Sequence, residues 1–195
     1  MMQPPLWAIE AMASAMQADR QGALPAGIAG ISIDSRTLQP GEAFFAIQGD
    51  ARDGHEFVDT ALKAGAGLAV VARDKAASFD SAAPLLIADD VLQGLRLLAQ
   101  AARARLRGRG IGVTGSVGKT GTKEALQRVL SRQGRTHASA ASYNNQWGVP
   151  LSLARCPQDC AFAVFEMGMN HAGEIGPLSR LVRPQIAIVT GIAPV

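Results

Sequence analysis

The stretch that decides the fold is Gly112-Val113-Thr114-Gly115-Ser116-Val117-Gly118-Lys119-Thr120. It joins Ile111–Thr114, a short buried strand by its composition, to a segment with the apolar spacing of a helix. A strand, a glycine-rich turn and a helix in this order are the setting that a phosphate-binding loop requires. Glycines let backbone N–H groups turn toward phosphate oxygens, and the positive end of the helix dipole adds to the attraction. The sequence therefore predicts an ATP-type phosphate site at Gly115, Ser116, Val117, Gly118, Lys119 and Thr120.

Two side chains of this loop have defined chemical roles in such a site. Lys119 can reach the β- and γ-phosphates, and the hydroxyl of Thr120 can ligate Mg²⁺. The strict G-x-x-x-x-G-K-[ST] pattern needs a glycine where Val113 stands, so the loop is a variant of that pattern. The structural alternative is a glycine-rich turn with an exposed lysine.

A carboxylate partner for the metal is expected at the end of a neighbouring strand. Ala161–Phe165 is a nearly continuous apolar run, and Glu166 follows it directly. Glu166 is therefore the predicted metal-side carboxylate, with a surface acid at a strand end as the alternative. In the next loop, His171 could be a metal ligand, a phosphate donor or a helix-start residue, and its chemistry alone does not decide. Asn144 and Asn145, taken alone, indicate only a turn.

Apolar strands separated by helices organise the second half of the chain. Ile186–Val189 is a third such strand, and strands that are apolar on both faces indicate a parallel sheet covered by helices. The helix after the loop is predicted to face the core with Ala125, Leu126, Val129 and Leu130. The predicted class is α/β, with a truncated parallel-sheet phosphate-loop ATPase domain over residues 84–195.

A small mixed α/β domain is predicted over residues 1–83. Its first helix has an apolar stripe formed by Ile9, Met12, Ala13 and Met16. Strands are expected at residues 28–33, 43–47 and 67–72. Asp53 is expected to cap a helix that Gly65 ends, and Asp89 or Asp90 to cap a long helix after residues 85–88.

The composition argues against several classes of protein. Hydrophobic residues make up 48% and charged residues 18%, which suits a buried core rather than disorder. The net charge of +3 owes much to arginines between residues 103 and 109, where cations complement a helix end; no aromatic residues interleave with them, so no nucleic-acid partner is expected. Cys156 and Cys160 are expected to be reduced thiols of a cytoplasmic protein. No signal peptide or membrane insertion is expected.

Four stretches, which lie in order along nearly the whole chain, together resemble the Mur ligase family. They are Asp34–Arg36 with Pro40–Ala46 and Asp53–Phe57; Thr114–Thr120; Asn144–Leu151; and Glu166–Ile175 with Arg183-Pro184. The resemblance accounts for the missing glycine at Val113. It also identifies one departure, because Gly121 stands where the family often has Ser or Thr. That change should be tolerable if Thr120 is the metal-side hydroxyl.

The resemblance implies an ATP-dependent ligase of peptidoglycan precursor synthesis, with ATP and Mg²⁺ as cofactors. The third and fourth stretches favour the member that adds D-alanyl-D-alanine to UDP-N-acetylmuramoyl-tripeptide through an acyl phosphate. The sibling that adds the third amino acid is an alternative, because it shares the N-terminal motif. A nucleotide-binding switch and a non-catalytic nucleotide-binding fragment are further alternatives.

The resemblance also assigns roles to residues. Those assigned to catalysis are Lys119, Glu166 and His171; those assigned to ATP are Gly115, Ser116, Val117, Gly118, Lys119, Thr120 and Gly121; those assigned to Mg²⁺ are Thr120 and Glu166; those assigned to substrate are Ser35, Arg36, His55, Asn144 and Asn145. Arg36 suits bidentate phosphate contact, with a structural salt bridge as the alternative. A helix-start role is the alternative for His55.

Length is the largest departure from the family. Members have a complete central domain and a C-terminal domain, with a metal-binding His and a carbamylated Lys beyond the point that corresponds to Val195. The 195 residues are therefore expected to be a fragment that binds phosphate without complete catalysis, taken from an enzyme that is monomeric when complete.

Overall fold

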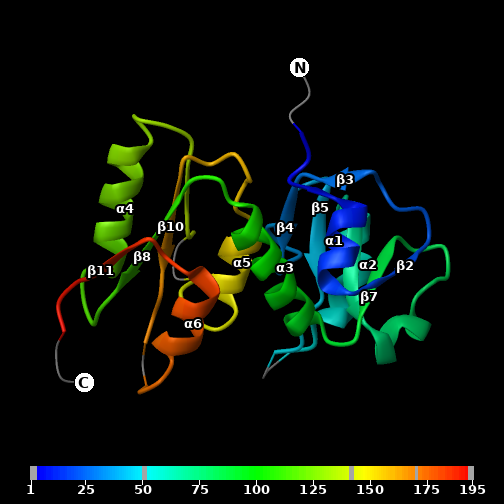
Figure 1. Ribbon diagram of the computed structural model, residues 1–195. Helices are drawn as coiled ribbons and strands as arrows, with labels where there is room; N and C mark the ends of the chain where they lie inside the picture. Colours follow the sequence, from blue (N-terminus) through cyan, green and yellow to red (C-terminus); the bar gives the residue numbers. More distant parts are fainter. Residues whose placement is uncertain (1–3, 50–51, 141–142, 170, 193–195) are drawn as a thin grey trace. The chain divides into compact units, whose positions relative to one another are not determined.

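The computed structural model describes residues 4–49, 52–140, 143–169 and 171–192 (Figure 1). The chain forms two compact units, Met1–Leu98 and Ala99–Val195. Both units are mixtures of helices and strands, as the α/β prediction requires. Within the described ranges, no helix is both long enough and apolar enough to cross a membrane.

The first unit is built on a five-stranded sheet with the order β2-β7-β6-β5-β4. Strands β4 to β7 are mutually parallel, and β2 runs antiparallel to β7. A separate antiparallel pair is formed by β1 and β3. The strands are β1 (Trp7–Ala8), β2 (Asp19–Gln21), β3 (Gly27–Ile28), β4 (Gly30–Ser32), β5 (Glu42–Phe45), β6 (Leu68–Ala72) and β7 (Leu85–Ala88). The helices are α1 (Ile9–Met16), α2 (Val58–Lys63) and the 3-10 helices η1 (Gly54–Phe57) and η2 (Arg73–Ser78).

Local sequence signals place α1 and α2 of this unit correctly. The predicted apolar stripe of α1 is confirmed, because all four of its residues are buried. The Asp53 side chain accepts a hydrogen bond from the His55 N–H at 3.0 Å, so it caps η1, which leads into α2. Gly65 follows α2 with a φ of +100°, a conformation that favours glycine and ends the helix.

The boundary between the units differs from the prediction. The apolar run Leu85–Ala88 is β7, which pairs with β6 and with β2 inside the first sheet. Helix α3 (Val91–Arg105) follows; Asp90 Oδ1 accepts from the Gln93 N–H at 2.5 Å near its start, and the division falls after Leu98. The predicted boundary at residue 83 is therefore too early, because a four-residue apolar run does not reveal which sheet it joins.

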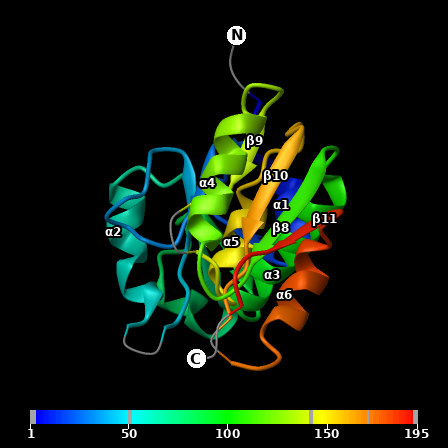
Figure 2. The same ribbon diagram turned by 90° about the vertical axis from the view of Figure 1, so that its left-hand side faces the viewer.

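The second unit contains the predicted parallel sheet, with the order β11-β8-β10-β9. Its strands are β8 (Arg109–Thr114), β9 (Thr136–Ala138), β10 (Phe162–Glu166) and β11 (Ile186–Val189), and each pairing is parallel. Helix α4 (Lys119–Leu130) covers one face, and α5 (Gly148–Ala154) and α6 (Ile175–Val182) cover the other (Figures 1 and 2). Neighbouring strands β8 and β10 are thus followed by helices on opposite faces, which makes their carboxyl ends a topological switch point where such sheets bind ligands.

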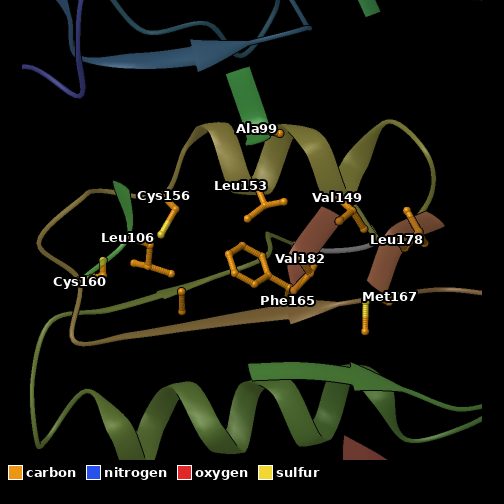
Figure 3. Packing of buried hydrophobic residues seen from close by; sticks show 11 residues of the cluster. Ala99, Leu106, Val149, Leu153, Cys156, Cys160, Phe165, Met167, Leu178 and Val182 are labelled. Atoms are coloured by element: carbon orange, nitrogen blue, oxygen red, sulfur yellow. The ribbon is translucent and has the colours of Figure 1, made fainter. Parts of the chain in front are cut away.

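Alternate residues of β10 pack on opposite faces of this sheet. Ala163 and Phe165 belong to the cluster beneath α5 and α6, and Figure 3 shows Leu153 of α5 directed toward Phe165. Val164 instead packs with Ile111 and Val113 on the face covered by α4. Both faces of the strand are therefore apolar, as its continuous hydrophobic run predicts.

The core side of α4 is only partly the predicted one. Leu126 and Leu130 pack against the sheet as expected. Ala125 is exposed and Val129 is 59% exposed, so the prediction is wrong for these two residues. The buried face is instead continued by Lys123, which is only 2% exposed. A buried lysine displaces the expected stripe because hydrophobic spacing treats every lysine as a surface residue.

Candidate functional site

The loop between β8 and α4 requires glycine at two positions. Gly115 has a φ of +134° and Gly118 a φ of +83°, both in the region that L-residues rarely adopt. A Cβ atom on Gly115 would also lie 2.1 Å from Thr190 Oγ1. The predicted order of strand, glycine loop and helix is confirmed, and the loop leads directly into the N-terminus of α4.

The segment after β11 holds this loop in place. Thr190 Oγ1 lies 3.0 Å from the Thr114 carbonyl oxygen and 2.6 Å from that of Val117. The Ser116 N–H donates to the Gly191 carbonyl oxygen at 2.8 Å. Residues 190 and 191 therefore hold the loop at three positions, which limits the reorganisation needed to bind an anion.

Lys119 lies over the loop that precedes it. Its Nζ donates to the Gly115 carbonyl oxygen at 2.6 Å and to that of Ser116 at 3.2 Å. Phosphate oxygens are stronger acceptors than carbonyls for an ammonium group. The Lys119 ammonium can therefore exchange these carbonyl acceptors for phosphate oxygens. It lies at the N-terminus of a 12-residue helix, where the helix dipole also favours anions.

Glu166 is at the end of β10 and is 1% exposed. The Thr120 hydroxyl lies 3.3 Å from its Oε1 and 3.1 Å from its Oε2. Asn144 Nδ2 donates to Oε1 at 2.9 Å, and Lys123 Nζ lies 4.0 Å from Oε2. The structure therefore brings together Thr120 and Glu166, the two residues assigned to the metal.

These oxygen atoms are suited to Mg²⁺. The ion prefers hard oxygen donors, keeps several waters, and is commonly held by one or two protein groups together with nucleotide phosphates. A hydroxyl and a carboxylate beside a phosphate loop match that donor set. No group of three His, Cys, Asp or Glu side chains among the described residues could hold a metal, so a closed, all-protein site is not present there.

Asn144 and Asn145 have different surroundings although they are adjacent. Asn144 joins Glu166 through its side chain, and its carbonyl oxygen accepts from the Gly168 N–H at 2.6 Å. The Asn145 Oδ1 atom accepts from the Trp147 N–H at 3.1 Å and the Gly148 N–H at 2.9 Å, at the start of α5. Asn144 is thus part of the carboxylate site, whereas the side-chain oxygen of Asn145 organises a helix start.

The contacts of His171 are with Glu174 rather than with Glu166. Its side chain is 84% exposed, and its Nδ1 is 3.3 Å from Glu174 Oε1. Its backbone N–H donates to Glu174 Oε2 at 3.1 Å, just before α6 begins. Of the three roles left open by the sequence, these contacts fit the helix-start residue.

In the first unit, Arg36 is paired with Asp34. Its Nε and Nη2 donate to Asp34 Oδ1 and Oδ2 at 2.9 and 2.6 Å, and its own side chain is 82% exposed. The side-chain hydrogen bond from Arg36 is the main cause that lowers the pKa of Asp34 to about 2. Ser35 lies between them in a turn and is partly buried. The salt-bridge alternative describes this geometry, while the exposed guanidinium remains accessible to an anion.

Both ring nitrogens of His55 have partners. Nδ1 is 2.5 Å from Asp53 Oδ1, and Nε2 accepts from the Ala72 N–H at 2.9 Å. Because Nε2 accepts, the proton of the neutral ring is on Nδ1. The side chain is 8% exposed and ties η1 to the end of β6. A structural role therefore accounts for His55, and its ring has no nitrogen left for a substrate in this conformation.

Sequence reasoning missed two residues of the site. Lys123 approaches Glu166, and Thr190 contacts the loop. The spacing of Lys123, three residues after Thr120 and four after Lys119, could have placed it on the same helix face. Thr190 follows an apolar strand and carries no comparable signal.

Comparisons with known proteins agree with this geometry. Residues 27–111 match the model described as "Mur ligase family, catalytic domain", and residues 113–195 match "Mur ligase middle domain". The UDP-N-acetylmuramoyl-tripeptide–D-alanyl-D-alanine ligase of Bacillus subtilis is 40% identical over 165 residues, which cover 85% of this chain and 36% of that protein. The ligase of the same name from Escherichia coli is 38% identical over 163 residues, covering 84% and 35%. The chain thus spans little more than a third of the length of these relatives.

Solved structures give the same result. Crystal structure II of MurF from Acinetobacter baumannii superposes with a TM-score of 0.79 at 34% identity, covering 94% of this chain and 40% of that one. The MurF ligase from Thermotoga maritima in complex with ADP gives a TM-score of 0.66 at 29% identity, covering 83% and 37%.

Proposed function

The chain belongs to the Mur ligase family, and on that premise we propose that it is the nucleotide-sugar- and ATP-binding part of a ligase. The complete enzyme adds D-alanyl-D-alanine to UDP-N-acetylmuramoyl-tripeptide, a step in making peptidoglycan precursors. The names of the relatives from Bacillus subtilis and Escherichia coli support this choice of substrates. The observation that carries the proposal is the buried Glu166 carboxylate beside Thr120, at the end of the loop that presents Lys119.

ATP would place its phosphates on the loop from Gly115 to Gly121. The backbone N–H groups of the loop and the α4 N-terminus would bind phosphate oxygens, and Lys119 would exchange its two carbonyl acceptors for the β- and γ-phosphates. The relative from Thermotoga maritima was solved with ADP, which supports nucleotide binding by this fold. Thr120 and Glu166 would hold Mg²⁺, which supplies charge neutralisation at the phosphates when it is bound.

The reaction needs an activated carboxyl group because a free carboxylate is a poor electrophile. A carboxylate oxygen of the tripeptide attacks the γ-phosphorus of ATP, the bond to the bridging oxygen breaks, and ADP leaves. The amine of D-alanyl-D-alanine then attacks the acyl phosphate carbon, and the tetrahedral intermediate collapses to a peptide bond and inorganic phosphate. Lys119 contributes by stabilising the negative charge on the transferred phosphoryl group.

The first unit would hold the nucleotide-sugar. Its exposed Arg36 can release Asp34 and pair with a diphosphate, since a guanidinium forms the same two-bond contact with both anions. Ser35 lies beside it in the same turn and offers a hydroxyl. His55 would contribute by holding η1 against β6 rather than by direct contact.

Nucleotide binding by this chain is the first test of the proposal. In this chain, Lys119→Ala is expected to weaken ADP binding by at least about tenfold in isothermal titration calorimetry, because a charge-assisted contact is lost. Arg128→Ala is the matched control, since it removes an exposed cation from the same helix. ADP affinity that is equal in wild type and Lys119→Ala would show that the loop does not bind phosphate as proposed.

Substrate choice is tested with the complete enzyme that contains this chain. The wild-type enzyme is expected to release phosphate from ATP with UDP-N-acetylmuramoyl-tripeptide and D-alanyl-D-alanine. Lys119→Ala is expected to abolish this release. Release with the UDP-linked dipeptide and a single amino acid instead would identify the sibling ligase.

A further inference from the structure

Lys123 is a buried cation that the proposed reaction does not use. Its side chain is 3% exposed, and its Nζ lies 4.0 Å from Glu166 Oε2, on a side chain that is itself 2% exposed. Removing an ammonium group from water is costly unless an opposite charge lies close by. Glu166 is the ionic partner of Lys123 among the described residues, so the two charges depend on each other.

Lys123 is also the source of positive charge at Glu166. The two groups that approach the carboxylate more closely, the Thr120 hydroxyl and the Asn144 amide, are neutral donors. Lys119, the other lysine on this helix face, is directed toward the loop carbonyls. The ammonium of Lys123 therefore neutralises Glu166 in this structure.

Lys123 cannot move far from the carboxylate. It is on the face of α4 that packs against the sheet, in the same row as Leu126 and Leu130. A divalent cation held by Thr120 and Glu166 would therefore share the carboxylate with a fixed positive charge. The repulsion between them is strong because the side chains of Lys123 and Glu166 are shielded from water.

From this geometry we propose that Lys123 competes with the divalent cation for Glu166 and keeps metal binding weak until a nucleotide arrives. This inference rests on the proposed placement of the metal at Thr120 and Glu166. The negative charge of nucleotide phosphates offsets the combined charge of the metal, Lys119 and Lys123. Metal and nucleotide then enhance each other's binding, and Lys123 sets the size of that coupling.

The test measures Mn²⁺ binding by this chain, with free Mn²⁺ counted by electron paramagnetic resonance at pH 8. Lys123→Met is expected to bind Mn²⁺ without nucleotide at least about tenfold more tightly than wild type, because the competing charge is gone. ADP is expected to enhance Mn²⁺ affinity less in Lys123→Met than in wild type. Lys123→Arg keeps the charge and is expected to behave as wild type does.

Two further variants keep the test decisive. Arg128→Met removes an exposed cation from the same helix and is expected to leave Mn²⁺ affinity unchanged. If Lys123→Met fails to fold, as shown by circular dichroism, Lys123→Gln replaces it, since the amide can still donate to Glu166 without carrying charge. Unchanged or weaker Mn²⁺ binding in the folded neutral variant would overturn the competition.

The outcomes separate this inference from the proposed function. Suppose that wild type binds Mn²⁺ in the presence of ADP, and that the neutral variant binds Mn²⁺ no more tightly than wild type. That result refutes the role of Lys123 and leaves the proposed function standing. Wild type that binds neither ADP nor Mn²⁺ refutes both proposals. Glu166→Gln should abolish the Mn²⁺ response, and its persistence would show that the metal is held elsewhere.

Discussion

Acidification should destabilise the second unit through His137 on β9. Burial is the main cause that lowers the pKa of this histidine to about 4; the charge of Arg155 acts in the same direction, and the hydrogen bond to Ser152 opposes it. Nε2 carries the proton of the neutral ring, because it lies 2.8 Å from the Ser152 carbonyl oxygen, which can only accept. The ring centroid is 6.0 Å from that of Phe165, so the imidazole is part of the packing beside β10.

The size of the effect follows from the difference in pKa between the two states. His137 takes up its proton near pH 6.5 when unfolded but only near pH 4 when folded, so the unfolded chain binds more protons between these values. Stability from this residue is therefore complete above pH 6.5 and falls as the pH drops toward 4. The full difference corresponds to about 3 kcal/mol, of which about 2 kcal/mol is lost between pH 7 and pH 5.

Urea denaturation followed by circular dichroism at pH 7 and pH 5 measures this loss. His137→Gln keeps a donor for the Ser152 carbonyl but cannot titrate, so its free energy of unfolding should fall less than that of wild type by about 2 kcal/mol. The pH dependence that comes from all other titrating groups is common to both proteins, so it cancels in the difference between their free energies of unfolding. Equal losses in wild type and His137→Gln would refute the claim that burial keeps His137 neutral.

Two further predictions concern the loop and the first unit. Gly115→Ala should destabilise the chain by about 2 kcal/mol or more in thermal unfolding, because its Cβ meets Thr190 and its φ is positive. The same change should weaken ADP binding in calorimetry. Gly121→Ala has nothing within 4 Å of its Cβ, so its thermal stability should be unchanged or higher. The pairing of Asp34 with Arg36 lowers the pKa of Asp34 to about 2, so its contribution to stability is present above pH 4 and lost as the pH falls toward 2. Acid titration monitored by fluorescence should show a smaller loss in Asp34→Asn over that range, and identical curves would contradict the pairing.

Local signals in the sequence were sufficient for the phosphate loop and for several helix ends. The glycines needed at Gly115 and Gly118, and the cap formed by Asp53, depend on backbone geometry within a few residues. Such signals are readable because the competing conformations cost energy locally. The same applies to α1, whose apolar stripe is complete within eight residues.

Other elements depend on contacts that are distant in sequence. Strands β2 and β9 have three residues each, include polar side chains, and exist because β7 and β10 offer unpaired edges. Helix α5 has seven residues, all buried, so it shows no contrast between an apolar and a polar face. Neither hydrophobic periodicity nor propensity can identify such elements, since their formation is decided by tertiary packing.

The direction of the Glu166 side chain shows how distant contacts create the site. The continuous apolar run of β10 conceals which residues face which helix, because both faces of the strand are covered. In the structure, Phe165 faces α5 and α6, so the alternation of a strand turns Glu166 toward α4, where Thr120 and Lys123 meet it. The parallel register that pairs Glu166 with Val113 then sets the carboxylate level with the start of the loop. A slip of one residue in β10 would reverse its faces and direct the carboxylate into the core beneath α5, so the register of this strand is as necessary to the site as the loop itself.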